Sequence, residues 1–180
     1  VKRKVTYGVN FKVTDEQGNE IKDYDINVHD KNADEDVTNF TALGYGKYYY
    51  TIDAKGYVVS NSTFSLGSKT ETVDGTYTVN VVLKKATENA WDGQTFTEPQ
   101  KDEDGTYLIS TGAELAWFAQ EVNSVAAKST STINGKLTKD IDLASHNFPQ
   151  IGYFNGGTEY VYYGGNFEGN NHKIYNFRFE

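Results

Sequence analysis

The strongest constraint on the fold of this chain is a strict alternation of apolar and polar residues near its start. The apolar positions of this run are Val5, Tyr7, Val9, Phe11 and Val13. A period of two places successive side chains on opposite faces of an extended strand, so one face is buried and the other is solvated. The alternation therefore predicts a β-strand over residues 5–13.

Further short alternating runs follow this strand, and turn signals separate them. The first turn, "DEQGNE", contains Gly18, and a glycine takes a positive φ without steric cost. The later runs are "DINVH", "GKYYYTID", "GYVVS", "STFSL" and "GTYTVNVVL". About seven strands at this spacing are typical of a β-sandwich rather than of alternating β–α units. The sequence therefore predicts a sandwich module over residues 1–86.

Two stretches of this module carry a resemblance to a known family. They read "VNFKVTDEQGNEIKDYDINV" and "GYGKYYYTIDAKGYV". They resemble the V-x-F-x-V-x-D-x-x-G-x-x-I opening and the G-x-Y-x-Y-x-x-x-A-x-G-Y stretch of carboxypeptidase-regulatory, or prealbumin-like, modules of bacterial surface proteins. The resemblance covers residues 5–85 and implies an immunoglobulin-like or prealbumin-like sandwich. It implies almost nothing about function.

A second module, over residues 87–180, follows the polar linker "KKATENA". Thr111 and Glu114 form a capping box, in which the threonine accepts from a first-turn amide and the glutamate reaches back. The apolar residues that follow at helical spacing are Leu115, Phe118, Ala119, Val122 and Ala126. This pattern predicts one amphipathic helix over about residues 112–126.

Strand signals return after the predicted helix. They lie in "GKLTKDIDL", "PQIGYF", "TEYVYYGGNFEG" and "HKIYNFRFE". The spacing of Leu137, Ile141 and Leu143 breaks a simple alternation. It therefore predicts a bend or bulge near Lys139.

The order of four segments in this module resembles a second family. The segments are "TYLISTGAELAWFAQEVN", "LTKDIDL", "PQIG" and "GGNFEGNNHKIYNF". They resemble the opening of right-handed β-helix-like regions that precede GLUG-type repeats in bacterial surface proteins and some surface peptidases. The family's last element reads F-x-G-x-F-D-G-N-G-H-x-I-x-N-L, whereas this chain has Glu168, Asn171 and Phe177 in place of Asp, Gly and Leu. The resemblance implies the start of a β-solenoid, with the helix covering its end.

The closing stretch is interpreted as the turn-and-strand corner of one solenoid rung. Asn171 is expected to take a left-handed conformation, which asparagine tolerates better than most residues. Phe167, Ile174 and Phe177 are expected to point into the core. Because a rung needs a neighbour to bury its face, and because the chain lacks a first methionine, we expect it to be part of a longer protein.

Charge and cysteine content restrict the classes of partner and the location. The net charge of −8 argues against binding nucleic acid, which requires a basic surface. The absence of cysteine excludes disulfides, thiolate catalysis and cysteine metal sites, and it fits a Gram-positive surface. No apolar run approaches the length of a membrane span. We therefore expect an extracellular protein of the bacterial cell surface.

Candidate catalytic residues are few. His172 lacks an H-E-x-x-H or G-x-S-x-G context, so we expect a structural residue whose ring bonds a backbone carbonyl. Asp140 and Asp142 in "KDIDL" are interpreted as structural residues on one strand face rather than as the paired carboxylates of a glycosidase. The sequence therefore predicts that this segment is not an enzyme.

One acidic loop is a candidate cation site. Its oxygen-bearing residues are Asp30, Asn32, Asp34 and Asp36. The EF-hand pattern fails there, because its sixth position is Glu35 rather than Gly and its twelfth is Thr41 rather than Glu. A looser loop site for calcium stays open, and no other cofactor is expected.

A Lys–Asn isopeptide bond is a further chemistry known for surface sandwiches. It requires a buried lysine, asparagine and carboxylic acid, and Lys12, Asn80 and Asp53 lie on suitable predicted strands. The alternation places all three on the polar face. We therefore expect no such bond.

Two tyrosine clusters, residues 48–50 and residues 160, 162 and 163, suggest carbohydrate binding, because sugar sites use planar side chains with a polar tip. Because side chains alternate along a strand, the tyrosines on one face of each strand are expected to enter the core. The opposite face leaves Tyr49 and Tyr162 as candidate glycan-binding residues.

Three hypotheses for the function follow. The first is a non-catalytic module pair of a secreted or wall-attached bacterial surface protein that spaces, displays or adheres. The second is the non-catalytic N-terminal part of a larger surface peptidase or glycan hydrolase; a downstream catalytic motif favours it, whereas a sorting signal after more repeats favours the first. The third is a glycan-binding module, whose partner is a host or cell-surface glycan or protein.

Overall fold

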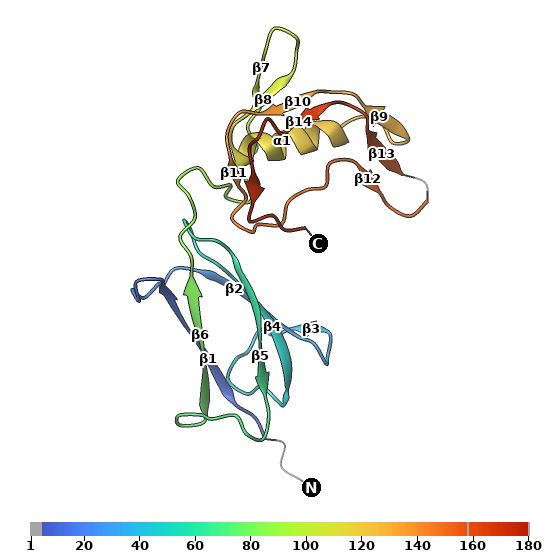
Figure 1. The fold of residues 1–180 in the computed structure, drawn as a ribbon. Coiled ribbons are helices and arrows are strands. Elements are labelled where there is room, and N and C mark those ends of the chain that lie inside the picture. Colours follow the sequence, from blue (N-terminus) through green and yellow to red (C-terminus); the bar gives the residue numbers. More distant parts are fainter. Residues whose placement is uncertain (1–4, 158, 180) are drawn as a thin grey trace. The chain divides into compact units, whose positions relative to one another are not determined.

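The computed structural model describes residues 5–157 and 159–179, and this part of the protein is all-β with a single short helix (Figure 1). The all-β class predicted from the sequence is confirmed. The chain divides into two compact units, Val1–Lys85 and Ala86–Glu180, next to the expected boundary. We call them unit 1 and unit 2. No described helix is long and apolar enough to cross a membrane.

The described residues of unit 1 form two sheets. Its described strands are β1 (Gly8–Asp15), β2 (Asp25–Asp30), β3 (Glu35–Asp36), β4 (Gly46–Asp53), β5 (Ser60–Leu66) and β6 (Thr76–Leu83). β1 pairs with β6 in parallel, and the other four form an antiparallel sheet in the order β3-β2-β4-β5. The short strand β3 lies in the acidic loop that the sequence offered as a candidate cation site.

One expected strand of unit 1 is absent from the described residues. The run "GYVVS" was expected to form its own strand, but only Ser60 of it joins β5. Tyr57 instead bridges Lys85, and the amide of Val58 donates to the carbonyl of Lys84 at 2.8 Å. These bonds draw residues 57–58 to the chain that leaves β6, and so remove them from the sheet.

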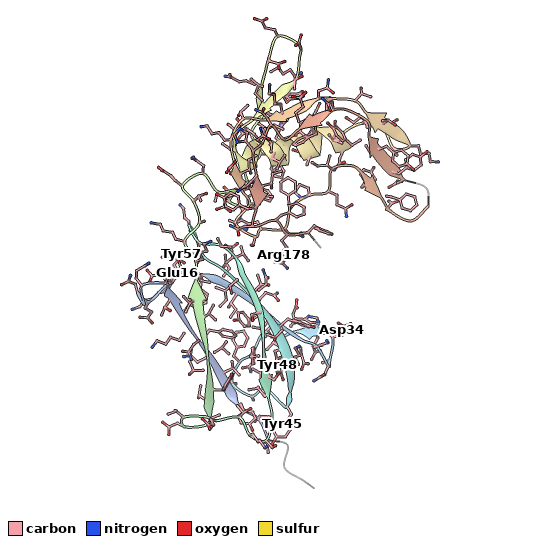
Figure 2. The ribbon with its side chains drawn as sticks, viewed as in Figure 1. Glu16, Asp34, Tyr45, Tyr48, Tyr57 and Arg178 are labelled. Carbon is pink, nitrogen blue, oxygen red and sulfur yellow. The ribbon has the colours of Figure 1, made fainter. Side chains whose placement is uncertain are left out.

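The core of unit 1 lies between its two sheets. The alternation in β1 buries Val9 and Val13, while Phe11 packs against the edge of the same core. Tyr48 of β4 is 2% exposed and lies between the sheets (Figure 2). The remaining core residues are Val28, Leu43, Tyr50, Ile52, Ala54, Phe64, Leu66, Val79, Val81 and Leu83.

The three residues considered for an isopeptide bond do not meet in a buried site. Lys12 and Asn80 are direct partners in the β1–β6 ladder, and both are exposed, as the alternation predicts. Asp53 is half-buried at the end of β4, which belongs to the other sheet of unit 1. Asp53 therefore does not supply the buried acid that the bond would require beside Lys12 and Asn80.

Unit 2 contains the helix α1 (Gly112–Asn123). The predicted capping box is confirmed: the amide of Glu114 donates to the Thr111 hydroxyl at 3.2 Å, and the amide of Thr111 donates to the Glu114 carboxylate at 3.0 Å. Its buried face comprises Leu115, Ala116, Phe118, Ala119 and Val122. The helix ends before the predicted residue 126, because the amide and hydroxyl of Ser124 bond back to the Glu121 carbonyl.

Short strands surround this helix. They are β7 (Gln100–Lys101), β8 (Tyr107–Ile109), β9 (Ser129–Ser131), β10 (Gly135–Leu137), β11 (Ile141–Asp142), β12 (Tyr153–Phe154), β13 (Tyr160–Tyr163), β14 (Phe167–Glu168) and β15 (Ile174–Tyr175). The chain bends at Lys139, between β10 and β11, which confirms the bend predicted near this residue.

Successive segments of unit 2 pair in parallel. β9 pairs with β13, β10 with β14, and β11 with β15. The partners lie a similar interval apart in the chain: Asn134 accepts a hydrogen bond from the amide of Asn166, 32 residues later. Two successive turns of chain therefore lie side by side, and the wider assignment to a solenoid stays a prediction.

The closing stretch differs from expectation in part. Asn171 takes the predicted left-handed conformation, with φ 61°. Phe167 packs on Phe118, with ring centroids 5.6 Å apart. The prediction that Ile174 and Phe177 point into the core is wrong, since they are 39% and 54% exposed. The reason is that β15 pairs only with β11 among the described strands, so no segment of the described chain covers it from the other edge.

Candidate functional site

Three aromatic side chains lie together on the outer surface of β12 and β13. Phe154 pairs directly with Tyr160 across these antiparallel strands, so their side chains share one face of the sheet. The ring of Tyr160 lies 4.8 Å from that of Tyr162, between centroids. Phe154 is 66% exposed and Tyr162 is 57% exposed. We call these three residues the aromatic face.

The inner surface of β13 anchors the aromatic face to the core of unit 2. β13 lies between β12 and β9 in a three-stranded sheet. Val161 is 1% exposed, and the ring of Tyr163 meets Phe118 edge-on with centroids 6.0 Å apart. Because side chains alternate along a strand, the inward orientation of the buried Val161 and the half-buried Tyr163 turns Tyr160 and Tyr162 outward.

The end of α1 fixes the chain that leads into β12. The Asn123 side chain donates to the carbonyl of Gln150 at 2.7 Å and accepts from the amide of Gly152 at 2.9 Å. Gly152 has φ +74°, and a Cβ there would lie 2.9 Å from the carbonyl oxygen of Val161. Only glycine fits this close approach without strain. The bonds of Asn123 and the close approach of Gly152 to Val161 therefore position the chain that enters β12.

Polar groups border the aromatic face. Thr130 of β9 is the direct partner of Tyr162. The Asn155 side chain donates to the Glu159 carboxylate at 3.1 Å, and both residues are exposed next to β12 and β13. The surface therefore combines flat apolar rings with hydroxyl, amide and carboxylate groups. This combination can take both the C–H face and the hydroxyl groups of a sugar.

The sequence predicted part of this site. Tyr162 was a candidate, and its exposure agrees with the expectation that it lies on the outward face of its strand. Phe154 and Tyr160 were missed. The spacing of Tyr160 and Tyr162 was a usable signal, because residues two apart in a strand share a face. Phe154 joins them only through the pairing of β12 with β13.

Tyr49, the other candidate glycan residue, lies on β4 of unit 1 with its side chain outward. Its neighbours Tyr48 and Tyr50 are buried, as the expected alternation requires, whereas Tyr49 is 40% exposed. The ammonium groups of Lys31 and Lys47 lie 5.5 and 5.9 Å from its ring centroid. A hydrogen bond from Lys31 lowers the pKa of the Tyr49 hydroxyl. The two lysines therefore already occupy part of the space around this single ring.

The acidic loop proposed for calcium stabilises the β2–β3 turn. Asp30 accepts from the amides of Asn32 at 2.8 Å and Ala33 at 3.3 Å. Asp36 and then Asp34 raise the pKa of His29, because they bond its two ring nitrogens at 3.0 and 3.2 Å. Asp34 projects outward at the turn (Figure 2). Within residues 5–157 and 159–179, no three His, Asp or Glu side chains are grouped to hold a metal ion.

His172 bonds a carboxylate, not the backbone carbonyl that we expected. Its Nδ1 lies 3.2 Å from Oδ1 of Asp140, a residue 32 positions earlier. The amide of Lys173 donates to the same oxygen at 3.0 Å. The Lys173 amide and then His172 lower the pKa of Asp140. The parallel pairing of β11 with β15 brings these residues together, and the Asp140–His172 pair ties two successive turns of the chain.

Asp142 is buried, with 3% exposure, and bonds four donors. Its Oδ1 accepts from the amide of Ala144 at 2.9 Å and from the Asn176 side chain at 2.7 Å. Its Oδ2 accepts from the amide and hydroxyl of Thr87 at 3.2 and 3.1 Å. Burial alone raises the pKa of this carboxyl, but these hydrogen bonds outweigh burial and lower it. Asp142 therefore joins three segments of unit 2.

No protein-family model matches the chain, and no curated protein matches it.

Proposed function

We propose that this chain is a non-catalytic pair of β-modules of a secreted or wall-attached bacterial surface protein, and that it contributes to adhesion by binding carbohydrate. The observation that carries the binding is the aromatic face, with two of its three rings more than half exposed on strands anchored in the core. The resemblance of both segments to bacterial surface modules supports the proposed location at a bacterial surface.

Physical reasons favour carbohydrate as the ligand. Single exposed apolar residues are common on protein surfaces and need no explanation. A group of neighbouring exposed rings is less common and is typical of an interaction surface. A pyranose ring presents a flat patch of C–H groups that stacks on an aromatic ring, and its hydroxyl groups need hydrogen-bond partners. Thr130, Asn155 and Glu159 supply such partners beside the rings.

A glycan array with the purified chain tests the proposal, followed by titration calorimetry with a bound sugar. We expect Phe154→Ala and Tyr162→Ala each to weaken binding by at least about tenfold, which corresponds to about 1.4 kcal/mol. Tyr162→Phe keeps the ring and should retain most of the affinity. Comparing Tyr162→Ala with Tyr162→Phe separates the contribution of ring stacking from that of hydrogen bonds made by the tyrosine hydroxyl.

Two matched controls sharpen this experiment. Tyr175→Ala removes an exposed aromatic ring of unit 2 that lies outside the aromatic face, and it should leave binding unchanged. Tyr49→Ala does the same in unit 1. Binding that depends on Tyr49 but not on Tyr162 would move the site to unit 1, and no signal on any sugar would refute carbohydrate binding.

A further inference from the structure

The first and last strands of unit 1 lie side by side and run in the same direction. β1 and β6 pair in parallel register from Gly8 with Thr76 to Asp15 with Leu83 (Figure 1). The chain enters β1 at one end of this ladder and leaves β6 at the other end. The two points where unit 1 joins its flanking chain are therefore at opposite ends of a single ladder.

This arrangement determines how unit 1 responds to a pull along the chain. Tension draws β1 toward its own start and β6 toward its own end, so the two strands are pulled lengthwise past each other. The ladder bonds of a parallel pair are evenly spaced along the strands, and such a pull loads them together. A pull applied to both strands at the same end would instead break them one after another.

We infer that unit 1 transmits mechanical force along the chain, and that the β1–β6 ladder is its mechanical clamp, the set of bonds that resists this force. This function goes beyond carbohydrate binding and does not depend on it. The clamp resists force applied between the residues that precede β1 and the residues that follow β6.

The core resists sliding of the clamp. A one-residue slip of β1 would turn the buried Val13 toward solvent, and a one-residue slip of β6 would do the same to Leu83; each residue is 1% exposed. A slip of two residues, about 6.6 Å, would restore the faces but would drag β1 through the core. Phe11 opposes this movement, because its ring contacts Phe40, Tyr50 and Phe64 with centroids 5.4 to 6.1 Å apart.

Backbone bonds outside the ladder reinforce both of its ends. Near the start of β1, the amide of Val9 donates to the carbonyl of Phe40 at 2.7 Å, and Tyr7 and Leu43 exchange two bonds of 2.8 Å. Beyond the end of β6, Lys84 accepts from Val58 at 2.8 Å. The chain is therefore held where tension enters unit 1 and where it leaves.

Single-molecule force spectroscopy on the full chain tests the clamp. The chain has no cysteine, so two introduced cysteines define the attachment points. Thr6→Cys with Lys84→Cys pulls the ladder in shear, whereas Thr6→Cys with Thr72→Cys pulls it from the Gly8–Thr76 end. All three residues are exposed and lie outside the strands. We expect the shear pair to unfold unit 1 at a force at least about twofold higher at the same loading rate.

Equal unfolding forces in the two geometries would overturn the proposal, and so would a lower force in shear. Val5→Cys with Lys85→Cys and Val5→Cys with Glu71→Cys repeat the comparison at other exposed positions, should a Thr6 variant fail to fold. Neither geometry touches the aromatic face. Failure of the clamp would therefore leave carbohydrate binding intact, and the reverse also holds.

Discussion

The Asn176 side chain donates a hydrogen bond of 2.7 Å to the buried carboxylate of Asp142, 34 residues earlier in the chain. Asn176 has φ 51°, a left-handed conformation that asparagine tolerates better than most residues. The same carboxylate oxygen accepts from the amide of Ala144, which also has a positive φ of 48°. One buried acid thus supports two turns that stand next to each other in successive passes of the chain.

Asp142→Asn should destabilise unit 2 by about 2 kcal/mol or more. The amide group replaces one carboxylate oxygen with a donor, so at least one pair of the four donors around Asp142 loses its acceptor inside the protein. Chemical denaturation of the variant measures the change. The matched control is Asp140→Asn, which removes the same charge from an exposed carboxylate and should cost much less. Equal losses in the two variants would contradict this role.

The contribution of Asp142 should also depend on pH. Its pKa in the folded protein is lowered below the ordinary value of 3.8, so the folded state binds the proton less readily than the unfolded state. The stabilisation is therefore complete above the ordinary value and is lost as pH falls through the folded pKa. Unfolding free energies of the parent and of Asp142→Asn, measured from neutral pH to about pH 2.5, should converge at the acid end. A difference in unfolding free energy that stays constant with pH would contradict a pH-dependent contribution of Asp142.

Gly135→Ala should destabilise unit 2 by about 1–3 kcal/mol through overpacking. A Cβ at Gly135 would lie 2.9 Å from Cζ of Phe118 and 3.1 Å from the ring of Phe167. Phe118 is fully buried, so its ring has no free space to move into. Thermal and chemical denaturation measure the change. Gly169→Ala is the control, since no atom lies within 4 Å of its Cβ position, and similar effects of the two substitutions would contradict the packing argument.

Local periodicity explains why much of the fold could be predicted from the sequence. The alternation in β1 and in the first tyrosine cluster identifies which side chains are buried, since burial there follows from the period of a strand. The capping box likewise predicts the start of α1, because both of its residues lie within one helical turn. These features need no knowledge of distant partners.

Pairings between distant segments could not be predicted in this way. The parallel ladder of β1 with β6 depends on the path of the whole intervening chain, and no local pattern encodes it. The same holds for Phe154, which becomes part of the candidate site only because β12 pairs with β13. His172 was expected to bond the backbone for the same reason: its actual partner, Asp140, lies one turn of chain earlier.

His172→Gln should change the thermal midpoint by less than about 2 °C. The His172 side chain is 29% exposed and that of Asp140 is 55% exposed, so water can replace their bond. The amide of Lys173 still donates to Asp140 in the variant, and it is the larger cause of the lowered pKa of that carboxyl. Differential scanning fluorimetry on the variant checks this. Binding of the sugar found on the array should be unchanged, and a loss of either property would assign His172 a larger role.

Intact-mass spectrometry should give the mass of the uncrosslinked sequence. An isopeptide bond between Lys12 and Asn80 would lower that mass by one ammonia. The two residues face each other directly across the β1–β6 ladder, so proximity is satisfied. Burial is not satisfied, because both side chains lie on the exposed face. Lys12→Arg, which cannot form the bond, should therefore differ from the parent only by the mass of the substitution, and a parent lighter by one ammonia would show that the bond forms even in water. Such a bond would lock the clamp covalently. An unreduced mass would therefore mean that any resistance of unit 1 to force rests on hydrogen bonds and core packing alone.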